Sequence, residues 1–264
     1  MQKPVRLTPS LREKVWGRTQ LLPWYPDAAT PIGESWFLCE RDLPLLVKWI
    51  FTSERLSVQV HPEDGEDGPR GKTEMWYILD AEPGATIAMG FREPLTRERL
   101  REATRTGEVE QLLRWVPVQP GETYFIPAHT VHAIGAGIVL CEIQQNSDVT
   151  YRLWDYGRPR ELHVEQAIPL CELGVHPGAS RPVELGEGRE ELVRSAYFVT
   201  ERVSVAAGGT FRAAPMACHL WICLAGSGSI GGEPYRAGEV WLVPEETRIV
   251  ASAASSFLRT WVPG

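Results

Sequence analysis

The sequence lacks any long apolar run. No uninterrupted apolar stretch approaches the ~18 residues that a membrane-spanning helix requires. The N-terminal segment MQKPVRLTPSLREKVWG also lacks the apolar core of a signal peptide. We therefore expect a cytoplasmic protein that has no membrane partner.

Cysteines are few and scattered, and no two of them form a C-x-x-C pair. The five positions are Cys39, Cys141, Cys171, Cys218 and Cys223. An odd number of isolated cysteines argues against a disulfide framework and against a zinc site made of thiolates. We expect reduced thiols that fill packed positions in the core.

The sequence is also short of basic charge. It has 27 Lys and Arg residues against 34 Asp and Glu residues, which gives a formal net charge of −7. We find neither a helix-turn-helix pattern nor a basic stripe, so nucleic acid is not an expected partner. An anionic ligand would have to be held by individual cations rather than by the overall charge.

What the sequence does contain is strand signals. With 264 residues, of which 43% are hydrophobic and 23% charged, the chain suits one large domain or two modest ones. Short runs rich in β-branched and aromatic residues are separated by Gly, Pro and charged clusters, a pattern typical of strands. Examples are LLVKWIF, EMWYIL, ATIAMGF, ETYFIP and GIVLCEIQQ. The pattern predicts a mainly β fold.

One segment departs from the strand pattern. Residues 95–116, LTRERLREATRTGEVEQLLRWV, predict a small helical insertion. Thr96 and Thr106 are candidate N-caps for two short helices, and Gly107 marks a break between them.

The chain contains an internal repeat on either side of a predicted boundary. Residues 173–193 are rich in Gly, Pro and charge and poor in strand pattern, which predicts a linker. GETYFIPAHTVH, from Gly121 to His132, aligns without a gap with GEVWLVPEETRI, from Gly238 to Ile249. EMWYILDAEPG can likewise be laid over HLWICLAGSGS. We interpret the two stretches as copies of one β unit, of which the second has lost the His132 position.

The stretch LSVQVHP, residues 56–62, places an unusual row of side chains on one face of a strand. Val58 and Val60 alternate as in a half-buried strand, so Ser57, Gln59 and His61 share the opposite face. Such a row suits a polar or metal-binding interior better than an apolar core.

Two further residues can join this row. Glu74 begins the next predicted strand after a turn-rich loop, and His132 follows the turn at Pro127. Imidazole and carboxylate ligands on several strands favour a zinc, iron, manganese or nickel site with an open position. The spacing is equally compatible with a buried polar network.

These motifs resemble a known family. The pattern G-x-x-x-x-x-P-x-x-x-x-H from Gly121 to His132 is similar to the second cupin motif. LSVQVHP with GKTEMWYIL resembles the variant first motif of type I mannose-6-phosphate isomerases. IGESW, LPLLVKWI, CEIQQNSDVTYRLWDYGR and RELHVEQA extend the resemblance, in order, over most of residues 13–168.

The resemblance implies a fold and a domain order. We expect two cupin-like, jelly-roll β-barrel units of the short bacterial form. Residues 1–172 would form a metal-binding catalytic domain that carries the helical insertion. Residues 173–193 would be the linker, and 194–264 would be a degenerate second cupin without a metal site.

The resemblance also implies site residues. One zinc per chain would be bound by Gln59, His61, Glu74 and His132. The implied catalytic residues are Arg152, Lys72, Asp148 and Glu142. The positions associated with the substrate phosphate are Ser57, Lys48 and Arg158. His129 stands where the motif carries a glycine, and it could narrow the pocket or support the metal ligands.

The implied activity is an aldose-ketose isomerisation. D-mannose 6-phosphate and D-fructose 6-phosphate would interconvert by metal-assisted proton transfer through a cis-enediol. Lys72 would move the proton if burial and the metal charge lower its pKa. Two alternatives stay open: a sugar-phosphate-sensing cupin without catalysis, and a metal-dependent isomerase of another sugar. The expected partner is a small sugar phosphate, and the chain would be a monomer or a homodimer.

Overall fold

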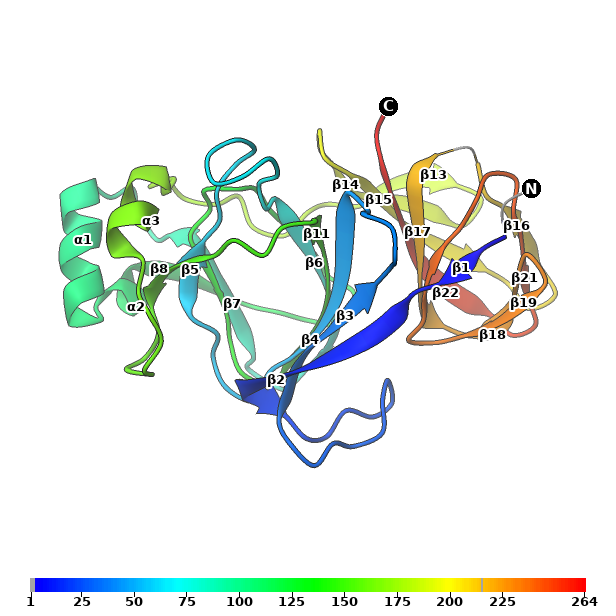
Figure 1. Ribbon diagram of the computed structural model, residues 1–264, viewed down its shortest axis with the longest axis horizontal. Coiled ribbons are helices and arrows are strands. Elements are labelled where there is room, and N and C mark those ends of the chain that lie inside the picture. The colour runs from blue at the N-terminus through cyan, green and yellow to red at the C-terminus, as the bar shows by residue number, and fades with distance from the viewer. Residues whose placement is uncertain (1–2, 215) are drawn as a thin grey trace.

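The structure consists of stacked layers that follow one another along the long axis of the molecule (Figure 1). It is a computed structural model that describes residues 3–214 and 216–264. Within these residues, a layer of three helices is followed by sheets of five, six, seven and four strands. All pairings between the named strands are antiparallel. The mainly β fold with a small helical insertion is therefore confirmed.

The N-terminal unit is a pair of facing sheets. The five-stranded sheet has the order β12 (Tyr151–Trp154), β5 (Val58–Val60), β10 (His132–Ile134), β7 (Thr86–Phe91) and β8 (Leu113–Pro117). The six-stranded sheet has the order β2 (Thr8–Arg18), β3 (Ile32–Leu38), β4 (Leu45–Phe51), β11 (Ile138–Gln145), β6 (Glu74–Ala81) and β9 (Thr123–Ile126). The space between these two sheets holds one hydrophobic cluster, with Ile50, Trp76 and Ile134 among its members.

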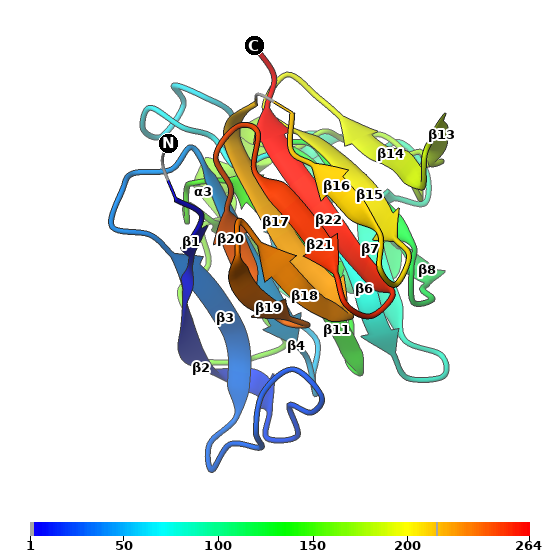
Figure 2. The ribbon, with the colours of Figure 1, turned by 90° about the vertical axis from the view of Figure 1, so that its right-hand side faces the viewer.

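The C-terminal unit repeats this arrangement. Its larger sheet has the order β1 (Val5–Arg6), β20 (Val240–Leu242), β17 (Ala217–Ala225), β22 (Ser255–Val262), β15 (Val199–Val205), β14 (Arg189–Arg194) and β13 (Val183–Gly186). Its smaller sheet has the order β16 (Thr210–Arg212), β21 (Arg248–Ala251), β18 (Ser227–Ile230) and β19 (Glu233–Arg236). Figure 2 shows the smaller sheet in front of the larger one.

The six-stranded sheet is covered on both faces, which explains its composition. All seven residues of β4, LLVKWIF, are buried. Val47 and Trp49 pack toward the C-terminal unit, in a cluster that includes Leu220 and Leu258. The intervening residues Lys48 and Ile50 therefore face the five-stranded sheet. A strand that is buried on both faces usually consists of apolar residues throughout, so the single lysine in β4 is unusual.

The helical insertion is shorter than predicted. Helix α1 (Arg97–Thr106) and helix α2 (Val109–Leu112) are followed at once by β8, so the last residues of 95–116 form a strand. Thr96 caps α1 by accepting a hydrogen bond from Arg99 N at 3.1 Å, and Gly107 ends α1 with a φ of 81°. The prediction that Thr106 caps α2 is wrong, because Thr106 is the last residue of α1 and α2 has no side-chain cap.

A third helix, α3 (Val164–Leu170), packs against α1 and β12. It was not predicted from the sequence. None of the helices in the described ranges combines the length and apolar character needed to cross a membrane.

The predicted linker contains strands. Strand β13 and most of β14 lie within residues 173–193 and extend the seven-stranded sheet. Every residue of β13 is exposed, so an apolar alternation could not mark it in the sequence. Near the N-terminus, β1 pairs with β20 and so joins the C-terminal unit. The domain limits at residues 172 and 194 stay a prediction.

The strand register confirms the internal repeat. In the first unit, Trp76 of β6 lies opposite Tyr124 of β9. In the second unit, Trp221 of β17 lies opposite Trp241 of β20. The sequence alignment matches Trp76 with Trp221 and Tyr124 with Trp241, so the two pairs are equivalent. The order of the strands in the sheets of the two units corresponds as well.

Each unit also buries one ion pair at an equivalent position, with the charges exchanged. Glu142 of β11 lies opposite Trp76 and pairs with Lys48 at 3.0 Å. Arg259 of β22 lies opposite Trp221 and pairs with Glu201 at 2.8 Å. All four charged side chains are at most 5% exposed. A buried charge requires such a partner, and the repeat has kept the pair while reversing its polarity.

The first of these pairs makes stability depend on pH. Burial alone would raise the pKa of Glu142, but the charges of Lys48 and Lys72 outweigh it and lower the pKa to about 2. A lowered pKa stabilises the fold above the unfolded value of about 4.3, and this contribution is lost as the pH falls toward 2. We predict that Glu142→Gln costs about 3 kcal/mol or more at pH 6. The cost should shrink steadily between pH 5 and pH 3, as measured by urea unfolding.

The matched control is Glu93→Gln, because Glu93 is exposed and has no ion-pair partner in the described part of the chain. This change should alter the free energy of unfolding by less than about 0.5 kcal/mol. A cost for Glu142→Gln that is the same at pH 3 and pH 6 would contradict the assignment of the ion pair.

Candidate metal centre and active-site cavity

Three neighbouring strands of the five-stranded sheet, together with the facing β6, bring the predicted ligands together. His132 of β10 lies opposite Gln59 of β5, and Arg152 of β12 lies opposite Gln59 on the other side. His61 comes two residues after Gln59, just beyond β5, so the two side chains point to the same face. Val58 and Val60 point to the other face and pack toward the helices. Glu74, the first residue of β6, completes the set from the facing sheet.

Glu74 lies between the two imidazoles. Its Oε2 is 3.6 Å from His61 Nε2, and its Oε1 is 3.5 Å from His132 Nε2. All three side chains are at most 1% exposed. Among the residues that the structure describes, this is the one group of His, Cys, Asp or Glu side chains with metal-site spacing, its ligand atoms lying within 4.8 Å of one another.

The hydrogen bonds of the two histidines fix which nitrogen faces the centre. His61 Nδ1 donates to Val149 O, and His132 Nδ1 donates to Thr130 O, both at 2.8 Å. Each Nε2 therefore presents a lone pair to the centre, the tautomer that metal ligands require. Burial lowers the pKa of His61 well below its usual value and that of His132 to about 4. Both rings are neutral at pH 7.

The Glu74 carboxylate lacks the partners that a buried carboxylate needs. Oε1 has no hydrogen-bond partner within the described residues. Burial, followed by the charge of Glu142, raises the pKa of Glu74 to about 7, although Lys72 opposes this. A carboxylate and two imidazole lone pairs that converge on one buried point fit a divalent cation.

Gln59 can join this set in one of its two amide orientations. Its Nε2 lies 3.3 Å from His132 Nε2, and its Oε1 accepts a hydrogen bond from Ser57 Oγ at 3.2 Å. An amide binds a metal through oxygen, so the ligand role requires the amide turned by about 180°.

Lys72 occupies part of the space that a cation would need. Its Nζ lies 2.8 Å from Glu74 Oε2 and 2.9 Å from His61 Nε2. Burial would lower the pKa of Lys72, but the charges of Glu74 and Glu142 outweigh it and raise the pKa. Lys72 is therefore an ammonium in the metal-free chain, and the lowering expected from a bound metal stays a prediction.

A cavity of about 280 Å³ opens beside the centre. Seven of the predicted site residues line it, namely Lys48, Ser57, Gln59, Lys72, Glu142, Asp148 and Arg152. Lining residues that were not predicted include Lys14, Trp16, Glu34, Trp36 and Arg160. Four of the predicted residues share the cavity because alternate residues of β4, β5, β11 and β12 face the same interior. The other three, Ser57, Lys72 and Asp148, lie in segments next to these strands.

Five cations line this cavity, and four of them have a carboxylate partner. Lys14 pairs with Glu34 at 3.2 Å, and Arg160 pairs with Asp155 at 2.6 Å. Lys48 and Lys72 pair with Glu142 and Glu74 as described above. Arg152 has no carboxylate within 4 Å among the described residues. Its Nη1 donates to the carbonyl of Glu161 at 2.8 Å, and its buried Nε has no partner there.

Arg158, expected near the substrate phosphate, is not among the lining residues. It pairs with Glu54 at 2.7 Å and with Asp155 at 3.2 Å. Arg160, two residues later in GRPRE, lines the cavity instead. Both arginines belong to one basic cluster of the sequence, and the conformation of the loop after β12 decides which of the two faces the cavity.

His129 is also outside this cavity. Its Nε2 lies 2.7 Å from Glu66 Oε2, and its backbone adopts a φ of 69°, a conformation that favours glycine. The backbone N–H of His129 donates to His61 O at 2.9 Å. His129 thus holds the loop beside a ligand without narrowing the cavity.

Known proteins resemble this chain in sequence and in structure. The mannose-6-phosphate isomerase of Streptococcus mutans is 37% identical over 219 residues, which cover 76% of this chain and 68% of the relative. The mannose-6-phosphate isomerase ManA of Bacillus subtilis is 31% identical over 296 residues, covering 92% of this chain and 93% of the relative. No family model matches the chain.

The solved structures agree with the sequences. The crystal structure of the mannose 6-phosphate isomerase from Bacillus subtilis superposes with a TM-score of 0.85 at 27% identity, covering 98% of this chain and 99% of that one. A zinc-bound mannose 6-phosphate isomerase shares the fold with a TM-score of 0.79 at 17% identity, covering both chains completely. The chain therefore belongs to the mannose-6-phosphate isomerase family.

Proposed function

We propose that this protein interconverts D-mannose 6-phosphate and D-fructose 6-phosphate at the cavity beside Glu74. The observation that carries the proposal is the buried Glu74 carboxylate, aimed with two imidazole lone pairs at one point beside a cavity that the unpaired Arg152 lines. The relatives that are named for this reaction support the choice of substrate.

We propose zinc as the metal, one ion per chain. His61, Glu74 and His132 would hold it, with Gln59 as a further ligand through its amide oxygen. Two imidazoles and one carboxylate form a common ligand set of catalytic zinc, and the zinc-bound isomerase shares the fold. When bound, zinc would polarise the sugar oxygens and stabilise the developing enediolate charge by several kcal/mol.

The cations of the cavity would hold the phosphate and the developing negative charge. Five cations line the cavity, and four of them already have a carboxylate partner among the described residues, so the fifth, Arg152, is the cation that remains for an anionic sugar phosphate. Arg152 is the best placed of these cations because its guanidinium is not committed to a carboxylate among the described residues. Its permanent charge suits anion binding and excludes a role as a base.

Lys72 would move the proton between the first and second carbons of the sugar. Lys72 loses two partners when Glu74 and His61 serve as metal ligands. The repulsion that it then experiences would lower its pKa toward the range in which a neutral amine accepts a proton. Glu142 and Asp148 line the same cavity and would position the sugar hydroxyls.

We assign catalysis to residues 1–172 because residues 194–264 lack the ligand set. The register places Phe211 and Ile249 in the second unit where Gln59 and His132 lie in the first. Neither side chain can bind a metal.

We predict that His61→Ala abolishes both zinc binding and turnover of mannose 6-phosphate, because one of the buried ligands is lost. Zinc content measured by atomic absorption should fall from one ion per chain to near zero. The matched control is His129→Ala, which removes an imidazole near the site but outside the ligand set and should retain zinc.

Zinc content equal to that of the wild type in His61→Ala would remove His61 from the ligands. If the variant kept turnover of mannose 6-phosphate, the proposed site itself would be wrong.

We predict that Lys72→Met keeps zinc but lowers kcat at least 100-fold, the size of effect expected for a general acid-base group. Zinc affinity should be unchanged or tighter, because the ammonium no longer competes for Glu74 and His61. Lys14→Met is the control, since it removes a cation from the same cavity and should act mainly on KM. Equal kcat losses for the two variants would indicate that Lys72 contributes only charge.

A further inference from the structure

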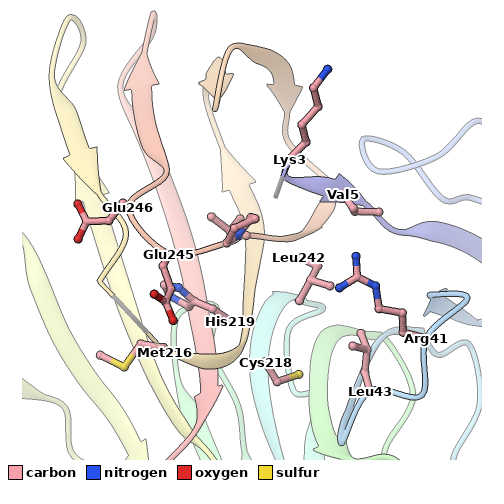
Figure 3. Close-up of a pocket in the computed structure, with 12 residues that line it drawn as sticks. Lys3, Val5, Arg41, Leu43, Met216, Cys218, His219, Leu242, Glu245 and Glu246 are labelled. Carbon is pink, nitrogen blue, oxygen red and sulfur yellow. The ribbon is translucent and has the colours of Figure 1, made fainter. Parts of the chain in front are cut away.

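The second unit contains a cavity of its own, with a volume of about 640 Å³ (Figure 3). Its lining consists of Lys3, Val5, Arg41, Leu43, Met216, Cys218, His219, Leu242, Val243, Pro244, Glu245 and Glu246. Five of these residues, 242–246, belong to the repeated stretch 238–249 and align with residues 125–129 of the first unit, and His219 lies on the neighbouring strand β17. The cavity therefore lies at the end of the second unit that corresponds to the metal centre of the first.

The register makes His219 the counterpart of Glu74. Glu74 lies opposite Ile126, and the backbone of His219 accepts a hydrogen bond from Val243 N at 2.9 Å at the equivalent position. Ala213 corresponds to His61, because Glu246 N donates to Ala213 O at 3.0 Å as His129 N does to His61 O at 2.9 Å. The second unit has thus replaced the ligand set but kept a polar side chain at the Glu74 position.

The electrostatics of the second unit are reversed. Arg259 stands at the position of Glu142, and it is 2% exposed. Glu201 pairs with Arg259 at 2.8 Å, so the two charges balance, and the reversed pair leaves no carboxylate at the Glu142 position to attract a cation.

His219 presents an unused donor. It is 2% exposed, and its Nε2 accepts a hydrogen bond from Trp221 Nε1 at 3.0 Å. The neutral ring therefore carries its proton on Nδ1, which is buried without a hydrogen-bond partner among the described residues. Burial and the charge of Arg259 lower the pKa of His219 to about 3, which keeps the ring neutral. Leaving such a donor unpaired costs about 1 to 3 kcal/mol.

The rim of the cavity supplies charge and apolar surface. Lys3 and Arg41 are exposed, and neither has an ion-pair partner in residues 3–214 and 216–264. Figure 3 shows both of them on the side of Val5 and Leu242. Glu246 is paired with Arg212 at 2.9 Å, so its charge is balanced. Glu245 brings one negative charge beside His219, so the two cations of the rim leave a net positive charge.

We propose that this cavity binds a small organic carboxylate. One carboxylate oxygen accepts the hydrogen bond from His219 Nδ1, and the hydrocarbon part packs against Leu43 and Leu242. Lys3 and Arg41 provide the favourable charge at the rim. Because Nδ1 is buried, binding requires a movement of the side chains that separate it from the cavity.

The test is a titration of the full chain with hexanoate and benzoate, and with hexanamide and benzamide as neutral counterparts. The readout is the ¹⁵N–¹H resonance of the Trp221 indole, assigned with Trp221→Phe, because this group donates to His219. We expect the carboxylates to shift this resonance saturably. The amides and the His219→Phe variant should bind at least tenfold more weakly, the loss expected for one hydrogen bond to a charged group.

A second variant keeps the test decisive if His219→Phe does not fold. Arg41→Glu reverses an exposed rim charge and should weaken the carboxylates several-fold without affecting the amides. Arg105→Glu, an exposed change on helix α1, is its control and should have no effect. The proposal is overturned if hexanoate and benzoate cause no saturable shift, if the amides bind equally well, or if neither His219→Phe nor Arg41→Glu weakens binding.

Discussion

The negative charge of a buried carboxylate must be compensated by a hydrogen-bond donor or a positive charge. The arrangement of the first unit depends on this requirement at Glu74. The side chain is fully buried, one oxygen has no hydrogen bond among the described residues, and two imidazoles turn their lone pairs toward it. Lys72 compensates part of this negative charge in the metal-free chain. A divalent cation would satisfy the whole set, because each ligand atom already faces the same point.

The layered fold makes this burial possible. The six-stranded sheet is covered by the five-stranded sheet on one face and by the C-terminal unit on the other, so its inward side chains have no access to bulk water except through the cavity. The C-terminal unit thus covers the outer face of this sheet, and the described lining of the cavity comes from residues 14–160. Its own interior keeps the ion-pair position with reversed charges.

The gathering of the candidate ligands around one point could be predicted because strand periodicity and the repeat motif place them on one interior face. Gln59 and His61 are two residues apart, and His132 ends the motif that begins at Gly121. Lys14, Glu34 and Arg160 could not be predicted, because they reach the cavity from β2, β3 and a loop without a sequence pattern. The raised pKa of Lys72 in the metal-free chain could not be predicted, because it depends on where the charges of Glu74 and Glu142 lie. Strand β13 was missed because all of its residues are exposed, so pairing with β14 alone defines it.

The central claim is that the centre around Glu74 binds a divalent metal on which isomerisation depends. The most direct measurement is the rate of mannose 6-phosphate conversion by the purified wild-type protein, before chelation, after chelation and after zinc is restored. The account predicts that turnover is lost on chelation and returns with about one equivalent of zinc per chain. Turnover that survives complete removal of the metal would contradict it.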